Sequence, residues 1–287
     1  FDMKLFSQGD YLRCMQEENE AEVISKVLYP ADDHYEGKSL RLKQQYFLVS
    51  ASLQNIINDH KHRYGPLNLL PQQAAIHIND THPALAIPEL MRLLMDENGF
   101  TWDDAWNITT SVFAYTNHTV MPEALETWQE DLIARRLPRI HMIIKEINRR
   151  FCNDLWNRYP GQHQLIESMA ILSNGQVRMA NLSVVGSHNV NGVSALHSEI
   201  IKKELFQGFY QLWPDKFTNV TNGIAHRRWL CQSNPELSAL LNDCIGDGYV
   251  KNASELINFK KYENDKSVLK QLSEIKQLKK RQFAEYA

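Results

Sequence analysis

Six polar residues stand in loops and are of the types that bind sugars: Asp80, His82, His118, His188, Asn191 and Asn222. Their carboxylate, imidazole and amide groups offer both donors and acceptors, and a hydroxyl-rich ligand needs both kinds of partner. Each residue alone has a commoner structural explanation, because an Asp before a helix usually caps it and a loop His usually makes structural contacts. The hypothesis of a sugar site therefore rests on the convergence of all six.

Two other short patterns leave their chemistry open. Gly186 and Gly192 bracket a segment whose backbone N–H groups could admit a phosphate, although no Gly-Lys-Ser/Thr follows and a tight turn is more typical. The adjacent Arg227 and Arg228 could hold a phosphate or carboxylate, but such a pair usually places one side chain in solvent and one in an ion pair.

No metal site is predicted. His77 and His82 are separated by a loop, so they do not share a helical face as the histidines of a zinc-binding helix do. The cysteines are widely spaced and form no C-x-x-C pair: Cys14, Cys152, Cys231 and Cys244. In a chain of this size they need no disulfide, and a reducing cytoplasm is the simplest compartment.

The elements that must position the polar residues alternate between helical and extended patterns, which indicates an α/β fold. A strand over 74–78 and a helix over 88–95 would place residues 79–83 at the carboxyl end of a strand, where open α/β sheets bind ligands. We expect the other helices over 11–28, 40–59, 101–113, 137–156 and 193–206 and through the last residues, a strand over 177–185, extended chain over 217–224, and loops over 29–37 and 186–192.

Composition excludes several classes of protein. The 287 residues are 43% hydrophobic and 23% charged, as in an ordinary globular protein. A formal net charge of −3 without a basic stripe argues against a nucleic-acid partner, and the apolar runs are too short to cross a membrane. Because the first residue is Phe1 and not Met, we expect the chain to be a piece of a longer protein.

Several longer motifs give the sequence a family resemblance. The chain resembles the α-glucan phosphorylases, the glycogen and maltodextrin phosphorylases, over essentially all of its residues. The motifs that carry the resemblance are Leu28-Tyr29-Pro30, residues 36–44, residues 79–92 beginning Asn79-Asp80-Thr81-His82-Pro83, Ala114-Tyr115-Thr116-Asn117-His118-Thr119-Val120, residues 122–126, Gly186-Ser187-His188, residues 190–193 and Thr221-Asn222-Gly223-Ile224. They correspond to a middle slice of that family's much longer chain.

The resemblance implies a partial GT-B glycosyltransferase fold, with Rossmann-like lobes facing across a cleft. Residues 1–220 would be the carboxy-terminal part of the amino-terminal, glucan-binding lobe, and residues 221–287 the beginning of the carboxy-terminal, cofactor lobe. It also implies reversible phosphorolysis, in which inorganic phosphate cleaves the terminal α-1,4-linked glucose and releases α-glucose 1-phosphate with retention. The implied cofactor of the parent enzyme is pyridoxal 5′-phosphate, whose phosphate group takes part in proton transfer, and the parent is expected to be a homodimer.

By resemblance, two residues are catalytic. His118 matches the histidine that binds the glucose 6-hydroxyl while its backbone carbonyl faces the reacting carbon, and Asp80 matches a pocket residue expected to orient His118. The remaining matches are substrate-binding residues and one neighbour of the cofactor ring: Asn222, His82, Thr119, Glu126, Asp32, Asn191 and Val193 for substrate, and Trp229 for the cofactor.

The sequence departs from the family pattern in a loop and lacks two of its motifs. Residues 30–37 match the mobile loop that gates the catalytic site, but Ala31 and Asp33 replace the asparagines of animal enzymes and His34 replaces an aromatic residue. The Gly-Asn-Met-Lys string with the Schiff-base lysine and the Lys-Arg-Ile-His-Glu-Tyr-Lys-Arg string are absent. We therefore expect this polypeptide alone neither to bind the cofactor covalently nor to turn over glucan.

Two alternatives remain. A sugar-nucleotide-dependent glycosyltransferase, such as a glycogen synthase, shares the two-lobe fold but would lack the N-D-T-H-P and Y-T-N-H-T strings. A glucan-binding or regulatory fragment would bind sugar without turnover.

Overall fold

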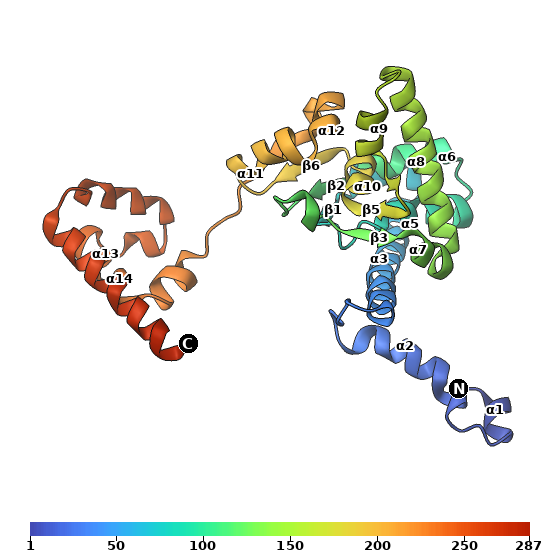
Figure 1. Ribbon diagram of the computed structural model, residues 1–287, viewed down its shortest axis with the longest axis horizontal. Helices are drawn as coiled ribbons and strands as arrows, with labels where there is room; N and C mark the ends of the chain where they lie inside the picture. Colours follow the sequence, from blue (N-terminus) through green and yellow to red (C-terminus); the bar gives the residue numbers. More distant parts are fainter. The chain divides into compact units, whose positions relative to one another are not determined.

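The computed structural model describes all residues from 1 to 287, which divide into two compact units, Phe1–Thr221 and Asn222–Ala287 (Figure 1). The helices are α1 (Met3–Ser7), α2 (Gln16–Lys26), α3 (Tyr35–Tyr64), α4 (Leu70–Gln73), α5 (Ala86–Arg92), α6 (Trp102–Val112), α7 (Glu130–Arg136), α8 (Pro138–Arg158), α9 (His163–Met169), α10 (Met179–Gly186), α11 (Ala195–Ile200), α12 (Gln207–Leu212), α13 (Pro235–Ile245) and α14 (Lys266–Tyr286). The strands are β1 (Ile76–Asn79), β2 (Phe113–Thr116), β3 (Thr127–Gln129), β4 (Leu172–Ser173), β5 (Gln176–Arg178), β6 (Asn189–Gly192) and β7 (Phe217–Asn219).

A parallel sheet organises the first unit. Its four strands lie in the order β1-β2-β6-β7, and every neighbouring pair is parallel. Asn79 pairs with Thr116, Thr116 with Asn191, and Gly192 with Asn219, so the four carboxyl ends meet at one edge. A small antiparallel sheet, β3-β5-β4, lies elsewhere in the unit. The predicted α/β class with a parallel sheet is confirmed.

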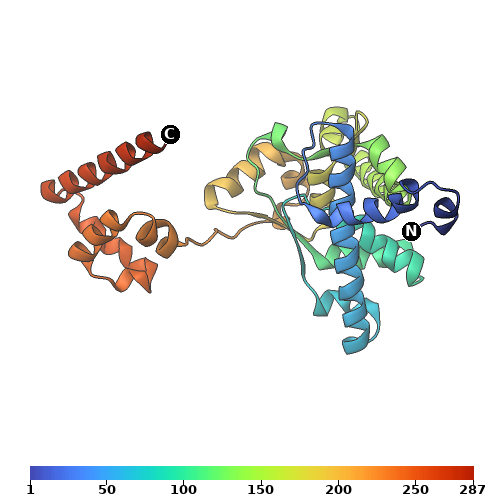
Figure 2. The same ribbon diagram turned by 90° about the horizontal axis from the view of Figure 1, so that it is seen from below.

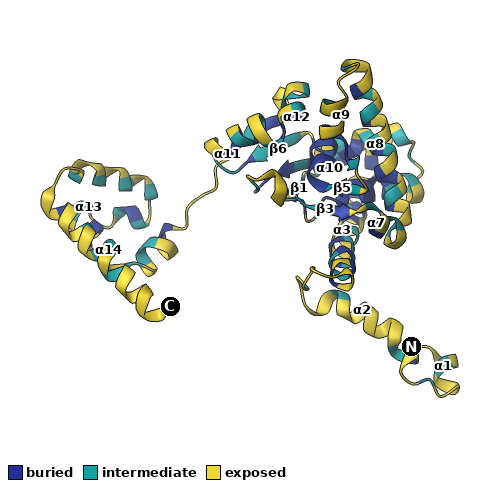
Figure 3. Ribbon diagram, viewed as in Figure 1, coloured by how far each residue is buried: buried dark blue, intermediate teal, exposed yellow.

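Helix α10 corrects the strand predicted over 177–185. Only Gln176–Arg178 is a strand, and Met179–Gly186 is a helix in which every residue is buried. It packs against α5, α6 and β2, and Figure 3 shows the buried residues gathered there and in the sheet. A helix buried on all sides carries no polar face, so its sequence has no 3.6-residue alternation and resembles a buried strand.

The tight loop predicted over 186–192 is also wrong. Residues 189–192 form β6, which lies between β2 and β7. Three asparagine and glycine residues in this strand lower its apparent strand propensity, but neighbours on both sides complete its hydrogen bonds. Gly192 is required for packing, because a Cβ there would lie 2.3 Å from Ser198 Oγ of α11.

The predicted loop over 29–37 ends earlier than expected. Helix α3 begins at Tyr35 and continues for 30 residues as one unbroken helix (Figure 2). His34 caps it, since its Nδ1 accepts a hydrogen bond from Gly37 N at 3.0 Å. A Cβ on Gly37 would lie 1.7 Å from Ala31 O, so the preceding loop lies directly against the first turn of the helix.

The other predicted helices are confirmed with shifted ends. Helix α6 follows Thr101, whose hydroxyl caps it, and α8 spans almost the whole of the predicted amphipathic segment. Helix α5 packs against α3, α6, α8 and α10, and so lies at the centre of the helical packing.

A buried carboxylate joins α5 to α3. Glu89 is fully buried, and each of its two oxygens accepts one hydroxyl and one guanidinium N–H. Tyr46 and Ser50 donate the hydroxyl bonds at 2.8 and 2.7 Å, and Arg92 donates two bonds at 2.8 Å. Burial and the negative charge of Glu89 raise the pKa of Tyr46 to about 12.

The second unit contains helices and no strand. Helices α13 and α14 contact one another, and Lys279 forms an ion pair with Glu236 at 2.5 Å. The buried ring of Tyr249 closes this small core, with its hydroxyl 2.8 Å from Ser238 Oγ.

Candidate functional site

The carboxyl edge of the parallel sheet brings together most of the sequence-predicted site residues. Asp80 and His82 follow β1, His118 and Thr119 follow β2, Asn191 lies in β6, and Val193 follows it. Three of the four strand ends deliver a predicted polar side chain to this edge, which is where open α/β sheets bind ligands.

Asp80 holds an unusual backbone conformation at this edge. Its φ is 60°, in the left-handed region that few residues other than glycine adopt. Two contacts hold it: its N–H donates to Thr116 O at 2.9 Å, and its Oδ1 accepts from Thr81 N at 2.7 Å. The second carboxylate oxygen has no partner within the chain, so Asp80 presents a free negative group at the site.

The resemblance led us to expect that Asp80 orients His118, but the hydrogen-bond partner of His118 is Asn79. His118 Nε2 lies 2.7 Å from Asn79 Oδ1, at the last residue of β1. Because an amide oxygen only accepts, Nε2 carries the proton and Nδ1 is left as an acceptor. The exposed ring can therefore accept a hydrogen bond from a ligand hydroxyl.

Asn191 has both ends of its side chain engaged. Its Nδ2 donates to Thr116 Oγ1 at 3.2 Å, and its Oδ1 accepts from Val220 N at 2.7 Å. Its backbone O accepts from Asn117 N at 3.1 Å. The residue thus links β2, β6 and the segment after β7 and has little capacity left for a ligand.

Asn117, which sequence reasoning did not single out, is completely buried beside His118. Its Nδ2 donates to Tyr115 OH at 2.9 Å, and its Oδ1 accepts from Thr119 N at 2.9 Å. Burial raises the pKa of Tyr115, and the negative charges of Asp80 and the nearby acid Glu126 add to the rise. The loop that carries His118 and Thr119 therefore rests on a closed buried network.

Both carboxylate oxygens of Glu126 already accept hydrogen bonds from other side chains. Its Oε2 accepts from Thr81 Oγ1 at 2.6 Å and its Oε1 from Gln45 Nε2 at 2.8 Å. This carboxylate fixes the loop after β1 to helix α3, so its contribution is to hold Asp80 and His82 in place.

His197 is a second residue that sequence reasoning missed. It is 5% exposed, and its Nδ1 accepts from Val193 N at 3.2 Å. Its Nε2 must then carry the proton, and it lies 2.9 Å from Thr119 O. The ring joins the loops that follow β2 and β6. A helix-start Ser194 three residues earlier, which caps His197 N, is the only sequence signal for this position.

The loop before α3 reaches the site through an aromatic and a cation. Arg41 lies 4.2 Å from the centre of the Tyr29 ring, and its Nη2 is 3.4 Å from His82 Nδ1. Tyr29 and His82 meet edge to face at 6.3 Å. Asp32, in the same loop, is exposed and makes no ion pair or hydrogen bond.

Two predicted site residues lie in the second unit. Asn222 is its first residue, and Trp229 belongs to the helical turn Arg227–Gln232 with 72% of its surface exposed. Arg227, the candidate anion ligand, donates to Val250 O at 2.9 Å.

No group of three or more His, Cys, Asp or Glu side chains is arranged to hold a metal ion, and all four cysteines are free thiols. None of the helices is both long enough and apolar enough to cross a bilayer.

Comparison with known proteins identifies the family. The family model described as carbohydrate phosphorylase matches residues 1–287. A glycogen phosphorylase of Bacillus subtilis is 50% identical over 266 residues, covering 93% of this chain and 33% of that protein. The muscle form of Bos taurus and glycogen phosphorylase 2 of Dictyostelium discoideum are each 45% identical, over all of this chain and 35% and 29% of their own lengths. The chain therefore spans about a third of the length of the curated relatives it matches, and it belongs to the carbohydrate phosphorylase family.

Proposed function

We propose that the chain is part of a glycogen or maltodextrin phosphorylase, which uses inorganic phosphate to release α-glucose 1-phosphate from the end of an α-1,4-glucan. The observation that carries the proposal is the convergence of Asp80, His82, His118 and Thr119 at one sheet edge in a chain of this family. The first unit would supply the glucose side of the catalytic site.

The free atoms at the edge suit a glucose unit. His118 presents Nδ1 as an acceptor for the 6-hydroxyl, while Asp80 presents an unpaired carboxylate oxygen. Thr119 and Asn222 would add polar contacts, and His82, Glu126, Asp32, Asn191 and Val193 complete the proposed set. A neutral glucan needs directional hydrogen bonds and no charge partner, which agrees with this mixture of groups.

Electrostatics favour the reaction at the same place. Asp80 and Glu126 put negative charge beside the loop of His118, and both raise the pKa of Tyr115. Fixed negative charge, together with the backbone carbonyl of His118, would stabilise positive charge that develops on the anomeric carbon. The left-handed Asp80 backbone sets this carboxylate before the substrate arrives, so little reorganisation is needed.

The residues described here do not by themselves make a cofactor site. Pyridoxal 5′-phosphate would supply a phosphate group for proton transfer in the parent enzyme. Trp229, whose ring is exposed, is the only residue of this chain that we assign to the cofactor. We assign no lysine of this chain to a Schiff base. We therefore propose that the isolated chain neither binds the cofactor covalently nor turns over glucan.

The remaining parts of the proposal concern the whole protein. The two units would correspond to the end of one GT-B lobe and the beginning of the next, and the parent would be a cytoplasmic homodimer without nucleic-acid or membrane partners. Apolar side chains exposed before α3, such as Leu12 and Val27, are of the kind that a subunit interface covers.

Three Asp80 variants test the sugar site. The Asp80→Asn and Asp80→Gly variants tolerate φ near 60°, whereas Asp80→Ala adds about 1 kcal/mol of backbone strain. If the carboxylate binds glucose, all three lose affinity in an NMR titration with maltoheptaose. The asparagine variant keeps its stability, because its amide oxygen can still accept from Thr81 N, and the alanine variant loses more stability than the glycine variant. Retention of affinity by the asparagine variant would refute the role assigned to Asp80.

Turnover is tested separately by incubating the chain with maltoheptaose and phosphate. We expect sugar binding and no α-glucose 1-phosphate. Product formation would contradict the inactivity of the isolated chain. Absence of binding in the wild-type chain would contradict the sugar site itself. A sugar-nucleotide-dependent glycosyltransferase is not favoured, because the family match is to carbohydrate phosphorylases.

A further inference from the structure

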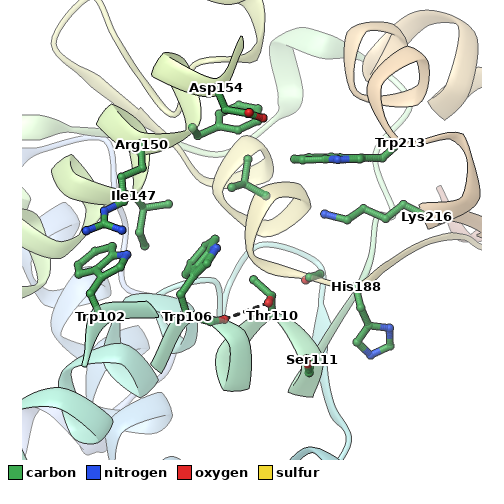
Figure 4. Close-up of a pocket in the computed structure, with 13 residues that line it drawn as sticks. Trp102, Trp106, Thr110, Ser111, Ile147, Arg150, Asp154, His188, Trp213 and Lys216 are labelled. Carbon is green, nitrogen blue, oxygen red and sulfur yellow. Dashed lines mark hydrogen bonds between the residues drawn. The ribbon is translucent and has the colours of Figure 1, made fainter. Parts of the chain in front are cut away.

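A cavity of about 650 Å³ lies in the first unit at the amino edge of the parallel sheet, opposite the candidate sugar site (Figure 4). Three of its lining residues lie just before strands: His188 directly precedes β6, Lys216 directly precedes β7, and Ser111 lies two residues before β2. Its volume is in the range that holds a small organic molecule.

Four aromatic rings line the cavity. Trp102 and Trp106 come from α6, Phe151 from α8 and Trp213 from the end of α12. In Figure 4 the two α6 indoles and the Trp213 ring lie on opposite sides of the space. Rings arranged in this way favour a flat aromatic occupant, which can stack or meet them edge to face.

The charges around the cavity are compensated with one exception. Arg150 donates to Asp103 at 2.8 Å and to Glu146 at 2.7 Å, and Asp154 pairs with Arg158 at 3.0 Å. The charges of Arg150 and Asp154 are therefore already balanced by neighbouring side chains.

Lys216 is the exception. Its Nζ lies 3.9 Å from the centre of the Trp213 ring and has no carboxylate within 4 Å. It donates one hydrogen bond, to Val184 O at 2.9 Å, and the other two N–H groups remain free. Burial lowers the pKa of this amine to about 8, so its charge is held at a cost that an anion would offset. In Figure 4 the amino group points into the cavity.

A second unsatisfied polar group lines the same space. Ser187 is completely buried, and its Oγ has no hydrogen-bond partner. Such an orphaned hydroxyl is uncommon in a folded protein and marks a place where a ligand acceptor or donor would be stabilised.

We propose that this cavity is a binding site for a planar aromatic anion, with the ring between the indoles and the carboxylate or phosphate on Lys216 Nζ, and with Ser187 as a second polar contact. The proposal does not depend on the phosphorylase activity, because the cavity lies at the opposite edge from the residues assigned to it. His188, which the sequence pattern grouped with the sugar-binding residues, lies at this amino edge and does not join them.

The test compares two ligands of nearly the same shape, one an anion and the other neutral. By calorimetry at pH 7, 2-naphthoate should bind at least about tenfold more tightly than 2-naphthamide, since a charge-assisted hydrogen bond contributes roughly 1.5–3 kcal/mol. The Lys216→Met variant keeps the apolar stem against Trp213 and should remove this preference without weakening the amide. A matched control is Lys202→Met, because Lys202 also lies over an aromatic ring, Tyr210 at 5.6 Å, but is paired with Glu199.

Indole N–H signals locate the binding site. The chain has 6 Trp, and naphthoate should shift the signals of Trp102, Trp106 and Trp213 but not those of Trp156 and Trp229. Three results would each overturn the proposal: equal affinities for the two ligands, no binding of either ligand, or signal shifts confined to Trp156 and Trp229. The comparison of ligands uses the wild-type chain, so it decides the question even if the variant fails to fold.

Discussion

Replacing His197 with phenylalanine tests whether one buried ring holds the two site loops together. Phenylalanine fills a similar volume but cannot accept from Val193 N or donate to Thr119 O. One hydrogen bond contributes about 1 kcal/mol net to the free energy of unfolding, and a buried donor or acceptor left without a partner costs more. Val193 and Thr119 are only partly buried, so water can reach them, and we expect a loss of about 2 kcal/mol.

The measurement is urea unfolding of the first unit. Because the chain has two compact units, the transition must be followed by a probe in the first unit, and buried Trp128 provides one. His62→Phe is the matched control, because this exposed histidine makes no hydrogen bond or ion pair, and its stability should change by less than about 0.5 kcal/mol.

Conservative variants separate the two bonds of His197. Asparagine can place its amide oxygen near the position of Nδ1 and so accept from Val193, whereas glutamine can place its amide nitrogen near Nε2 and donate to Thr119. Each should restore about half of the lost stability. If the ring positions the site, His197→Phe should also weaken maltoheptaose binding and speed amide exchange at Asn117. A phenylalanine variant as stable as the His62→Phe control, with unchanged exchange, would refute the reasoning.

Three further predictions follow from buried groups and close contacts. Glu89→Gln should destabilise the first unit by about 3 kcal/mol in urea unfolding, because an amide N–H would face a guanidinium N–H in a buried pair, whereas Glu97→Gln at the exposed end should cost under about 1 kcal/mol. Gly37→Ala should cost about 1–3 kcal/mol in the same assay, because the added carbon would overlap Ala31 O. For Lys216 the folded pKa of about 8 lies below the usual 10.5, so the folded state loses its proton first and stability rises as pH increases between these values. The Lys216→Met variant should lack this rise, which is about 3 kcal/mol.

Each of these has a result that would contradict it. Equal costs for the Glu89 and Glu97 variants would show that burial of the carboxylate does not matter. An alanine variant of Gly37 with wild-type stability would mean that the loop moves away freely. Parallel pH curves for the wild type and the Lys216→Met variant, recorded by urea unfolding from pH 7 to pH 10.5, would show that the amine is not desolvated.

The sequence predicts the sugar-site edge best where strand, loop and helix follow one another with clear patterns. The apolar run before Asn79 and the periodic helix after Pro83 locate the loop that carries Asp80 and His82, and the structure keeps that order. The prediction fails over 177–192, where α10 and β6 are surrounded by other elements. Burial on all sides removes the polar face on which periodicity depends, so only the tertiary neighbours distinguish a helix from a strand there.

Residue type and spacing also cannot show which polar atoms the protein already uses. Asn191 and Glu126 are of the right types for sugar ligands, but their side-chain oxygens and nitrogens hold neighbouring loops in place. His118 and Asp80 retain free atoms, because Asn79 and Thr81 occupy only one side of each. Substitutions at this edge should therefore divide into two kinds. Those at Asn191 and Glu126 change stability and sugar affinity together, because the ligand meets displaced loops. A substitution of the Asp80 carboxylate that preserves its backbone changes affinity alone, and the ratio of the two effects measures whether a residue binds the sugar or holds the residues that do.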